Sequence, residues 1–176
     1  MHDRALRLNR FTVLQQSKNK AMTINQPMTM VTDYLLGAVA LICGGCLLRS
    51  NGHKSKTLVL WSTGFFSAAA AAALGGTFHG FAAYQSARMH NALWNLTLLL
   101  IGASSGFLIS ASISGWVRDK PEAGRWLRAG ILVTAVGLAV QISGASLHPS
   151  FNYNDLYHCA QTIGLYCVFR GASLTR

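Results

Sequence analysis

Long stretches without Asp, Glu, Lys or Arg dominate this chain of 176 residues. Three of them cover residues 57–87, 89–117 and 129–154. Each is longer than the roughly 20 residues that cross the hydrocarbon core of a bilayer as an α-helix. The pattern therefore predicts three membrane-spanning helices.

Two shorter apolar stretches flank these three. Residues 31–48 are interrupted only by Asp33, and residues 155–172 contain only Asp155 and Arg170 as charged side chains. A charge in the headgroup region costs little, so both stretches also predict spanning helices. The expected fold class is all-α, an integral membrane bundle of about five transmembrane helices. The expected helices cover residues 31–48, 57–81, 90–116, 126–147 and 155–172, within one domain of residues 31–176.

The first 30 residues have a different composition. Their basic residues are Arg4, Arg7, Arg10, Lys18 and Lys20. Their apolar stretch, residues 11–14, is too short for the core of a secretory signal peptide. We interpret residues 1–30 as a basic leader that forms no domain. This leader is either disordered or overextended, in which case the true start codon lies further along.

The overall composition agrees with a membrane protein. Apolar residues make up 51% of the chain and charged residues 11%, whereas ordinary soluble domains contain about 25% charged residues. This balance argues against a soluble enzyme and excludes a disordered chain. The net charge of +10 does not indicate nucleic-acid binding, because basic and aromatic residues are not interleaved over a folded surface. The expected partner is the lipid bilayer.

The basic residues between the expected helices predict the orientation. After residue 30, the first and third loops and the C-terminal tail hold Arg49, Lys54, Lys56, Arg118, Lys120, Arg125, Arg128, Arg170 and Arg176. The second loop holds only Arg88, and the fourth holds none. Because basic loops remain in the cytoplasm, we expect a cytoplasmic C-terminus and an N-terminus outside the cell membrane. The tryptophans at expected helix ends, Trp61, Trp94, Trp116 and Trp126, are interpreted as an aromatic belt at the membrane interface.

Candidate chemistry gathers on the outward side. The ends of the expected helices on that side contain His79, His90, His148, His158, Asp33 and Asp155. Ionisable groups inside a bilayer usually face a cavity or one another, so an outward-facing polar pocket is expected. Asp155, His158 and either Gln161 or Thr162 are spaced to share one face of the last helix.

The two acids and two of the histidines also have a purely structural interpretation. Asp33 and Asp155 both fit the first turn of a helix, where a carboxylate accepts hydrogen bonds from free N–H groups and stabilises the helix dipole. His90 and His148 fit as hydrated residues at the interface. These alternatives require no chemistry.

A zinc site is the sharper hypothesis. His79 and His158, with His90 or His148, would supply three neutral imidazoles and leave a fourth position for water. Asp155 or Asp33 would then orient a ligating histidine or accept a proton from that water, which makes both acids candidate catalytic residues.

Three short segments resemble known families. The Thr-Phe-His sequence of residues 77–79, the Asn-Asp-Leu-Tyr-His sequence of residues 154–158 and the Arg-Gly of residues 170–171 resemble small uncharacterised bacterial membrane proteins. They are also similar, more distantly, to the CREST superfamily of membrane hydrolases, which includes alkaline ceramidases and adiponectin-receptor-like proteins. In that superfamily a Phe-His in the second helix and a His-x-x-x-His in the last helix hold a zinc ion.

The resemblance implies zinc ligands at His79 and His158 and hydrolysis of a lipid amide or ester. The sequence departs from the superfamily at Asn154, which stands where the first histidine of the last pair would be, and at Gly75, which stands where a serine would be. His90 lies near the position of an acid in the third helix and becomes the candidate third ligand.

Two other classes of function remain open at this point. A non-catalytic subunit or assembly factor would pack its small-residue helix faces on membrane-protein partners. A haem protein would use His79 opposite His158 as axial ligands.

Overall fold

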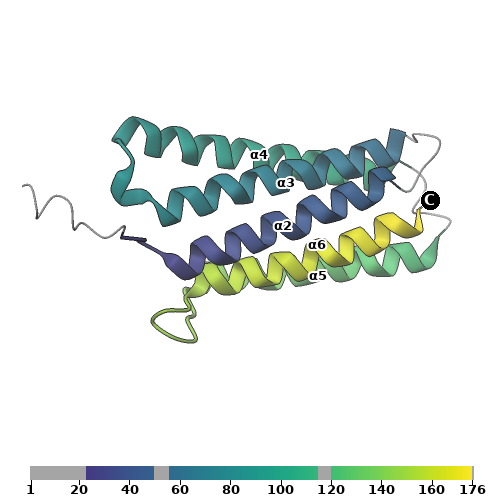
Figure 1. The fold of residues 1–176 in the computed structure, drawn as a ribbon. Coiled ribbons are helices and arrows are strands. Elements are labelled where there is room, and N and C mark those ends of the chain that lie inside the picture. The colour runs from purple at the N-terminus through teal and green to yellow at the C-terminus, as the bar shows by residue number, and fades with distance from the viewer. Residues whose placement is uncertain (1–22, 50–55, 115–119, 176) are drawn as a thin grey trace, which may run out of the picture.

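The structure, a computed structural model, describes residues 23–49, 56–114 and 120–175. Its long helices are α2 (Pro27–Arg49), α3 (Lys56–Gly80), α4 (Ala87–Ile113), α5 (Pro121–Ser143) and α6 (Tyr153–Leu174), with a short 3-10 helix, η1 (Ala82–Tyr84), between α3 and α4. The described ranges form no β-strand, so the expectation of an all-α fold with five long helices is confirmed (Figure 1). Residues 1–22 of the expected leader and Trp116 lie outside the described residues.

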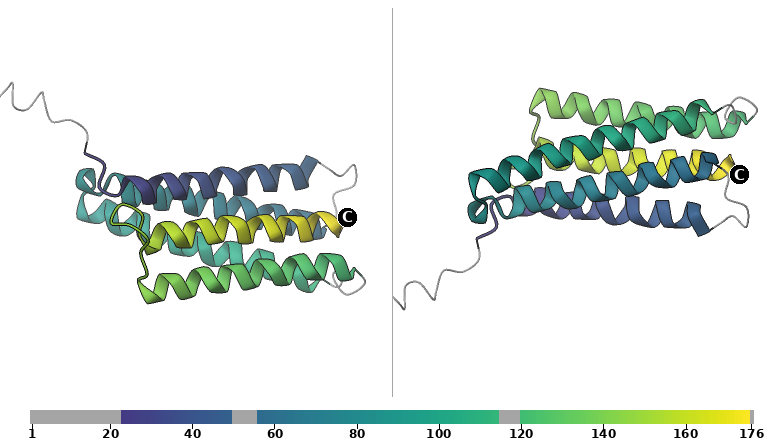
Figure 2. Two further views of the ribbon diagram at one scale, coloured as in Figure 1. Left: turned by 90° about the horizontal axis from the view of Figure 1, so that it is seen from below. Right: turned by 90° about the horizontal axis from the view of Figure 1, so that it is seen from above.

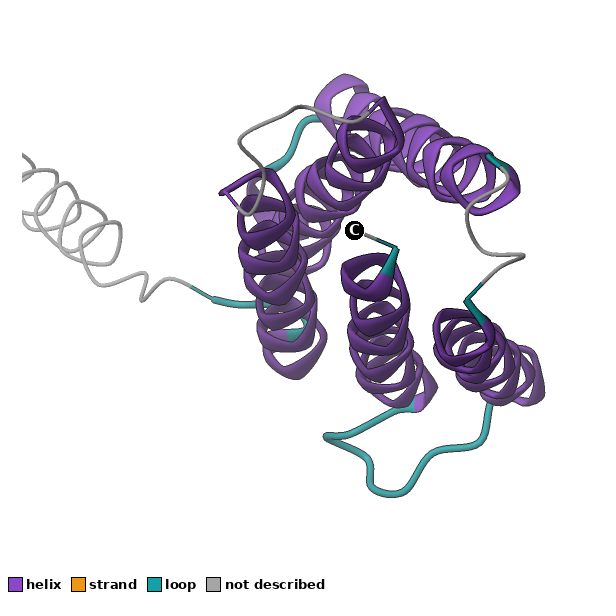
Figure 3. Ribbon diagram, turned by 90° about the vertical axis from the view of Figure 1, so that its right-hand side faces the viewer, coloured by secondary structure: helices purple, strands orange, loops and turns teal. Residues whose placement is uncertain are grey.

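The helices run alongside one another in a bundle in which successive helices are antiparallel, whereas the packed neighbours α2 and α6 are parallel (Figure 2). Their packing follows the order α4, α3, α2, α6, α5, because α2 packs against both α3 and α6. Helices α4 and α5 are therefore the two ends of an open arc, and they form no extensive contact with each other (Figure 3). The bundle is thus closed on the side of α2 and open between α4 and α5.

Four of the helices, α2, α3, α4 and α5, are long and apolar enough to cross a membrane. Helix α6 has a similar length of 22 residues, but Asn154, Asp155, His158 and Gln161 make it more polar. The composition therefore supports a membrane protein. That α6 also crosses the bilayer, and that the N-terminus lies outside, stay predictions.

The helix boundaries differ from the expected ones by a few residues, for local reasons. Helix α5 starts at Pro121 rather than 126, because proline fits the first helical turn, where its missing N–H is not needed. It ends at Ser143 rather than 147, because Gly144 adopts a left-handed conformation with φ 68°. Helix α2 starts at Pro27, so the expected leader overlaps its first turn.

A hydrophobic core occupies the end of the bundle where α2 and α6 finish. Its buried residues are Ala40, Cys43, Leu47, Leu58, Trp61, Phe65, Ala111, Leu127 and Ala172. Phe65 also meets Phe169 of α6 edge to face, with ring centroids 6.4 Å apart. The interfacial interpretation of Trp61 is wrong, because its side chain is completely buried in this core.

Glycines allow the helices to approach closely, as expected in membrane bundles. Between α5 and α6, a Cβ at Gly137 would lie 2.7 Å from the Cβ of Ala160, and one at Gly130 would lie 2.9 Å from the carbonyl oxygen of Gly164. By contrast, a Cβ at Gly102 on α4 would meet no atom within 4 Å. The α5–α6 pair therefore depends on these small residues.

We expect Gly137→Ala to lower the free energy of unfolding by about 1–3 kcal/mol, because the added methyl group overlaps the rigid Cβ of Ala160. The measurement is the thermal unfolding midpoint of the purified protein in detergent. Gly102→Ala is the matched control and should leave the midpoint unchanged or slightly higher. Equal midpoints for the two variants would contradict this account of the α5–α6 contact.

Candidate functional site

A cavity of about 310 Å³ lies inside the arc of helices. All five long helices contribute to its lining. At the end where α2 and α6 begin, the lining is polar and contains Asp33, His79, Gln141, Asn154, Tyr157, His158 and Gln161. Further along the helices it includes Leu36, Ala68, Ile101, Leu108, Leu165 and Val168. The cavity is therefore elongated, with a polar end and a largely apolar interior.

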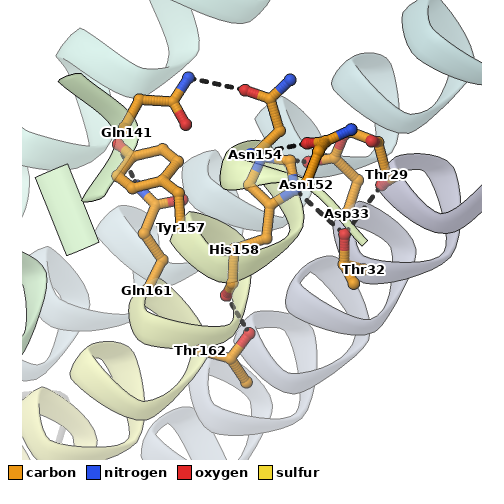
Figure 4. Close-up of polar contacts among 10 residues, drawn as sticks. All are labelled: Thr29, Thr32, Asp33, Gln141, Asn152, Asn154, Tyr157, His158, Gln161 and Thr162. Carbon is orange, nitrogen blue, oxygen red and sulfur yellow. Dashed lines mark hydrogen bonds and ion pairs between the residues drawn. The ribbon is translucent and has the colours of Figure 1, made fainter. Parts of the chain in front are cut away.

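His158 joins the last helix to the first at the polar end (Figure 4). Its Nε2 lies 3.3 Å from Oδ1 of Asp33, and its Nδ1 lies 3.2 Å from Oγ1 of Thr32. Thr32 in turn donates a hydrogen bond to the carbonyl oxygen of Thr29, at 3.1 Å. Both ring nitrogens of His158 thus have partners on α2, which fixes the imidazole in the cavity wall.

Asp33 is a cavity residue and not a helix cap. Helix α2 begins at Pro27, which puts Asp33 beyond the first turn, and the side chain is buried between α2, α3 and α6. Its Oδ2 is buried and has no hydrogen-bond partner among the described residues. The capping interpretation is therefore wrong for Asp33. A close approach to Gly75 makes room for the carboxylate, since a Cβ there would lie 3.2 Å from Oδ2.

Asp155 has the opposite role. It forms a capping box with Asn152 at the start of α6, in which its Oδ2 accepts the backbone N–H of Asn152 at 2.7 Å. It is fully buried and does not line the cavity. The structure therefore supports the capping interpretation of Asp155 and does not bring this residue together with His158 as a facing catalytic pair.

The four candidate histidines also differ in whether they line the cavity. His79 lines the cavity together with His158. His90 instead pairs its Nδ1 with Oε1 of Gln85 at 2.9 Å and stacks on Phe78 with ring centroids 4.2 Å apart. His148 is exposed in the loop between α5 and α6, where its Nδ1 accepts the backbone N–H of Ser150. Neither His90 nor His148 lines the cavity.

The zinc ion implied by the resemblance does not fit this arrangement. Within the described ranges, no group of three or more His, Cys, Asp or Glu side chains is placed to hold a metal ion. His79 and His158 share the cavity, but His158 already uses both nitrogens on α2.

The cavity also contains the amide side chains of Gln141 and Gln161, of which only Gln161 was predicted to share a face with His158. Gln141 donates from Nε2 to Oδ1 of Asn154 at 2.7 Å, which links α5 to α6. Gln161 donates from Nε2 to the hydroxyl oxygen of Tyr157 at 2.6 Å. The signal for Gln141 was present, because a lone amide within a long apolar stretch usually faces the interior of a membrane bundle.

These features define a helical membrane protein with a polar-ended cavity among its helices. The model of a family of unknown function, DUF6962, matches residues 28–127 and 114–176, and the chain belongs to this family. No curated protein and no solved structure matches the chain. The similarity to the CREST superfamily therefore stays a hypothesis.

We expect Asp33 and His158 to be energetically coupled. Asp33→Ala or His158→Ala alone leaves a buried polar partner unsatisfied and should cost about 1–3 kcal/mol of unfolding free energy. The double variant should cost less than the sum of the two, with a coupling energy of roughly 0.5–3 kcal/mol. The measurement is a double-mutant cycle from unfolding in detergent.

A matched control cycle combines Asp33→Ala with Thr175→Ala. Thr175 donates a hydrogen bond to the carbonyl oxygen of Ala172 at the far end of α6, at 2.7 Å, and does not line the cavity. This control pair should be additive. Additivity in the Asp33–His158 cycle as well would mean that the α2–α6 contact contributes no coupling.

Proposed function

We propose that this protein binds an amphiphilic molecule taken from the bilayer. The observation that supports the proposal is the elongated cavity, whose polar end contains Asp33 and His158 and whose interior contains leucine, isoleucine and valine side chains. Its volume of about 310 Å³ is at the lower end of the range of small-molecule pockets. A polar group with part of one alkyl chain matches this division.

The opening between α4 and α5 supplies a route of entry. Trp94, Ile101 and Leu108 of α4 line one side of the cavity, and Thr134 and Gln141 of α5 line the other. Because α4 and α5 do not pack extensively on each other, an alkyl chain in the bilayer can enter sideways without crossing water. The polar group would then lie toward the outward side that the Lys and Arg distribution predicts.

A photoreactive probe tests this proposal. Hexadecanol with a mid-chain diazirine and a terminal alkyne should label the purified protein in lipid nanodiscs, with the adducts on peptides from the cavity-lining parts of α4, α5 and α6. Ala68→Phe places a ring in the apolar part of the cavity and should reduce labelling at least severalfold. Ala70→Phe, on the exposed side of the same helix, is the matched control and should label as the native protein does.

Labelling that is equal in the two variants would overturn the proposal, because it would come from the lipid-facing surface. Each variant should also elute as a single monodisperse species, which separates loss of binding from loss of folding. Should neither variant nor native protein be labelled in the cavity, the non-catalytic subunit that binds membrane-protein partners becomes the better hypothesis.

Zinc-dependent hydrolysis of a lipid amide or ester is the second candidate function. The observation in its favour is that His79 and His158 line the same cavity, as the resemblance to the CREST superfamily requires. The observation against it concerns the third zinc ligand, because His90 pairs with Gln85 and does not line the cavity. Binding therefore has more support than catalysis.

Elemental mass spectrometry on gently purified protein separates the two candidates. Because the described donors do not form a three-ligand set, we expect far less than one zinc ion per chain. Near-stoichiometric zinc that is lost in the variant His79→Ala with His158→Ala would contradict this expectation. It would establish the second candidate and justify assays with lipid amides and esters.

A further inference from the structure

We infer that the polar group of the bound amphiphile is a primary ammonium, so that the ligand is a single-chain alkyl amine. This inference rests on the proposed binding function and adds the chemical class of the ligand. It follows from the hydrogen-bonding groups and charges at the polar end of the cavity.

The polar end offers hydrogen-bond acceptors that have no donor. Oδ2 of Asp33 on α2 and Oε1 of Gln141 on α5 are both buried and have no partner among the described residues, and both side chains line the cavity. The amide nitrogen of Gln141 is already engaged by Asn154, so the orientation of its oxygen is fixed. A buried acceptor without a donor lowers the stability of the folded protein. A ligand that donates a hydrogen bond to this acceptor would remove that penalty.

An ammonium group fits these acceptors better than other polar groups. It carries three N–H donors and no acceptor, so it can satisfy the unpartnered oxygen of Asp33 without introducing an unpaired acceptor of its own. A hydroxyl group brings one donor together with an acceptor oxygen that itself needs a further donor. Hydrogen bonds from a cation to a carboxylate are also about twice as strong as those between neutral groups.

The charges around Asp33 favour the same ligand. The titratable side chains that face its carboxylate or lie near it are His158 on α6, His79 on α3 and Asp155 at the start of α6. No Lys or Arg is present in the described lining of the cavity. A phosphate or carboxylate headgroup would therefore meet a buried acid without a permanent cation to bind it, which is unfavourable at low dielectric.

A metal cation is a poorer occupant of this position than an ammonium. Divalent ions need several protein ligands, and the described residues contain no group of three suitable side chains. An ammonium has no such requirement for a set of ligands, and the carboxylate of Asp33 alone supplies a charged acceptor for it. The apolar interior beyond Leu36 and Leu165 then receives the alkyl chain.

Competition against the hexadecanol photoprobe tests the inference. The competitors are tetradecylamine, tetradecanol and tetradecanoic acid, which share one chain length and differ in the polar group. We expect the amine to suppress labelling of the native protein at a concentration about tenfold lower than that of the alcohol or the acid. Asp33→Asn should remove this advantage, because it keeps the shape of the side chain and deletes its charge.

Two controls keep a loss of folding distinct from a loss of recognition. Asp33→Asn should elute as a single monodisperse species, and competition in this variant is measured relative to its own labelling without competitor. Asp155→Asn changes a buried acid that does not line the cavity, and it should retain the preference for the amine.

The outcomes distinguish this inference from the proposed function. Equal competition by the three compounds, with labelling still suppressed by Ala68→Phe, would overturn the ammonium assignment and leave the binding function standing. An amine preference that survives in Asp33→Asn, or a preference for the acid, would also overturn it. Cavity labelling that neither the competitors nor Ala68→Phe reduce would contradict the binding function itself.

Discussion

The contact of His158 with Asp33 and Thr32 determines how the two parts of this bundle are joined. Helices α2, α3 and α4 pack in sequence, and α5 packs on α6, so α6 must pack on α2 for all five helices to surround one space. The imidazole of His158 reaches α2 through both ring nitrogens. A buried polar pair is costly unless it is satisfied, and this contact therefore favours one position of α6 along α2.

A tightly packed core and the cavity occupy different ends of the bundle. Trp61, Phe65 and Leu47 fill the end where α2 and α6 finish, and there the helices leave little free space. The cavity and its unsatisfied oxygens lie toward the other end. Close approaches at Gly137 and Gly164 hold α5 against α6, whereas no comparable contact holds α5 against α4. The arc of helices is consequently open on the side where the packing is weakest.

Asp33 and Asp155 have similar neighbours in the sequence but different structural roles. Helix capping fixes Asp155, whereas contacts between helices fix Asp33. Each follows a residue that can cap a helix, so the sequence alone permits capping for both. Asp155 meets free N–H groups at the start of α6 and caps it. Asp33 lies beyond the first turn of α2, because Pro27 starts that helix earlier, and its carboxylate must find partners on another helix. His158 supplies one of them, and the second oxygen remains available to a ligand.

The sequence by itself determined the class of the protein, its five helices and the polar character of one end of the bundle. These depend on local properties, since charge-free stretches of sufficient length must form helices to satisfy their backbone hydrogen bonds in lipid. Only the tertiary structure decided that Trp61 is buried and that His90 pairs with Gln85. It also decided that α4 and α5 remain apart. The rotation of each helix about its axis and the choice of its neighbours depend on packing between distant segments, and local hydropathy contains no information about either.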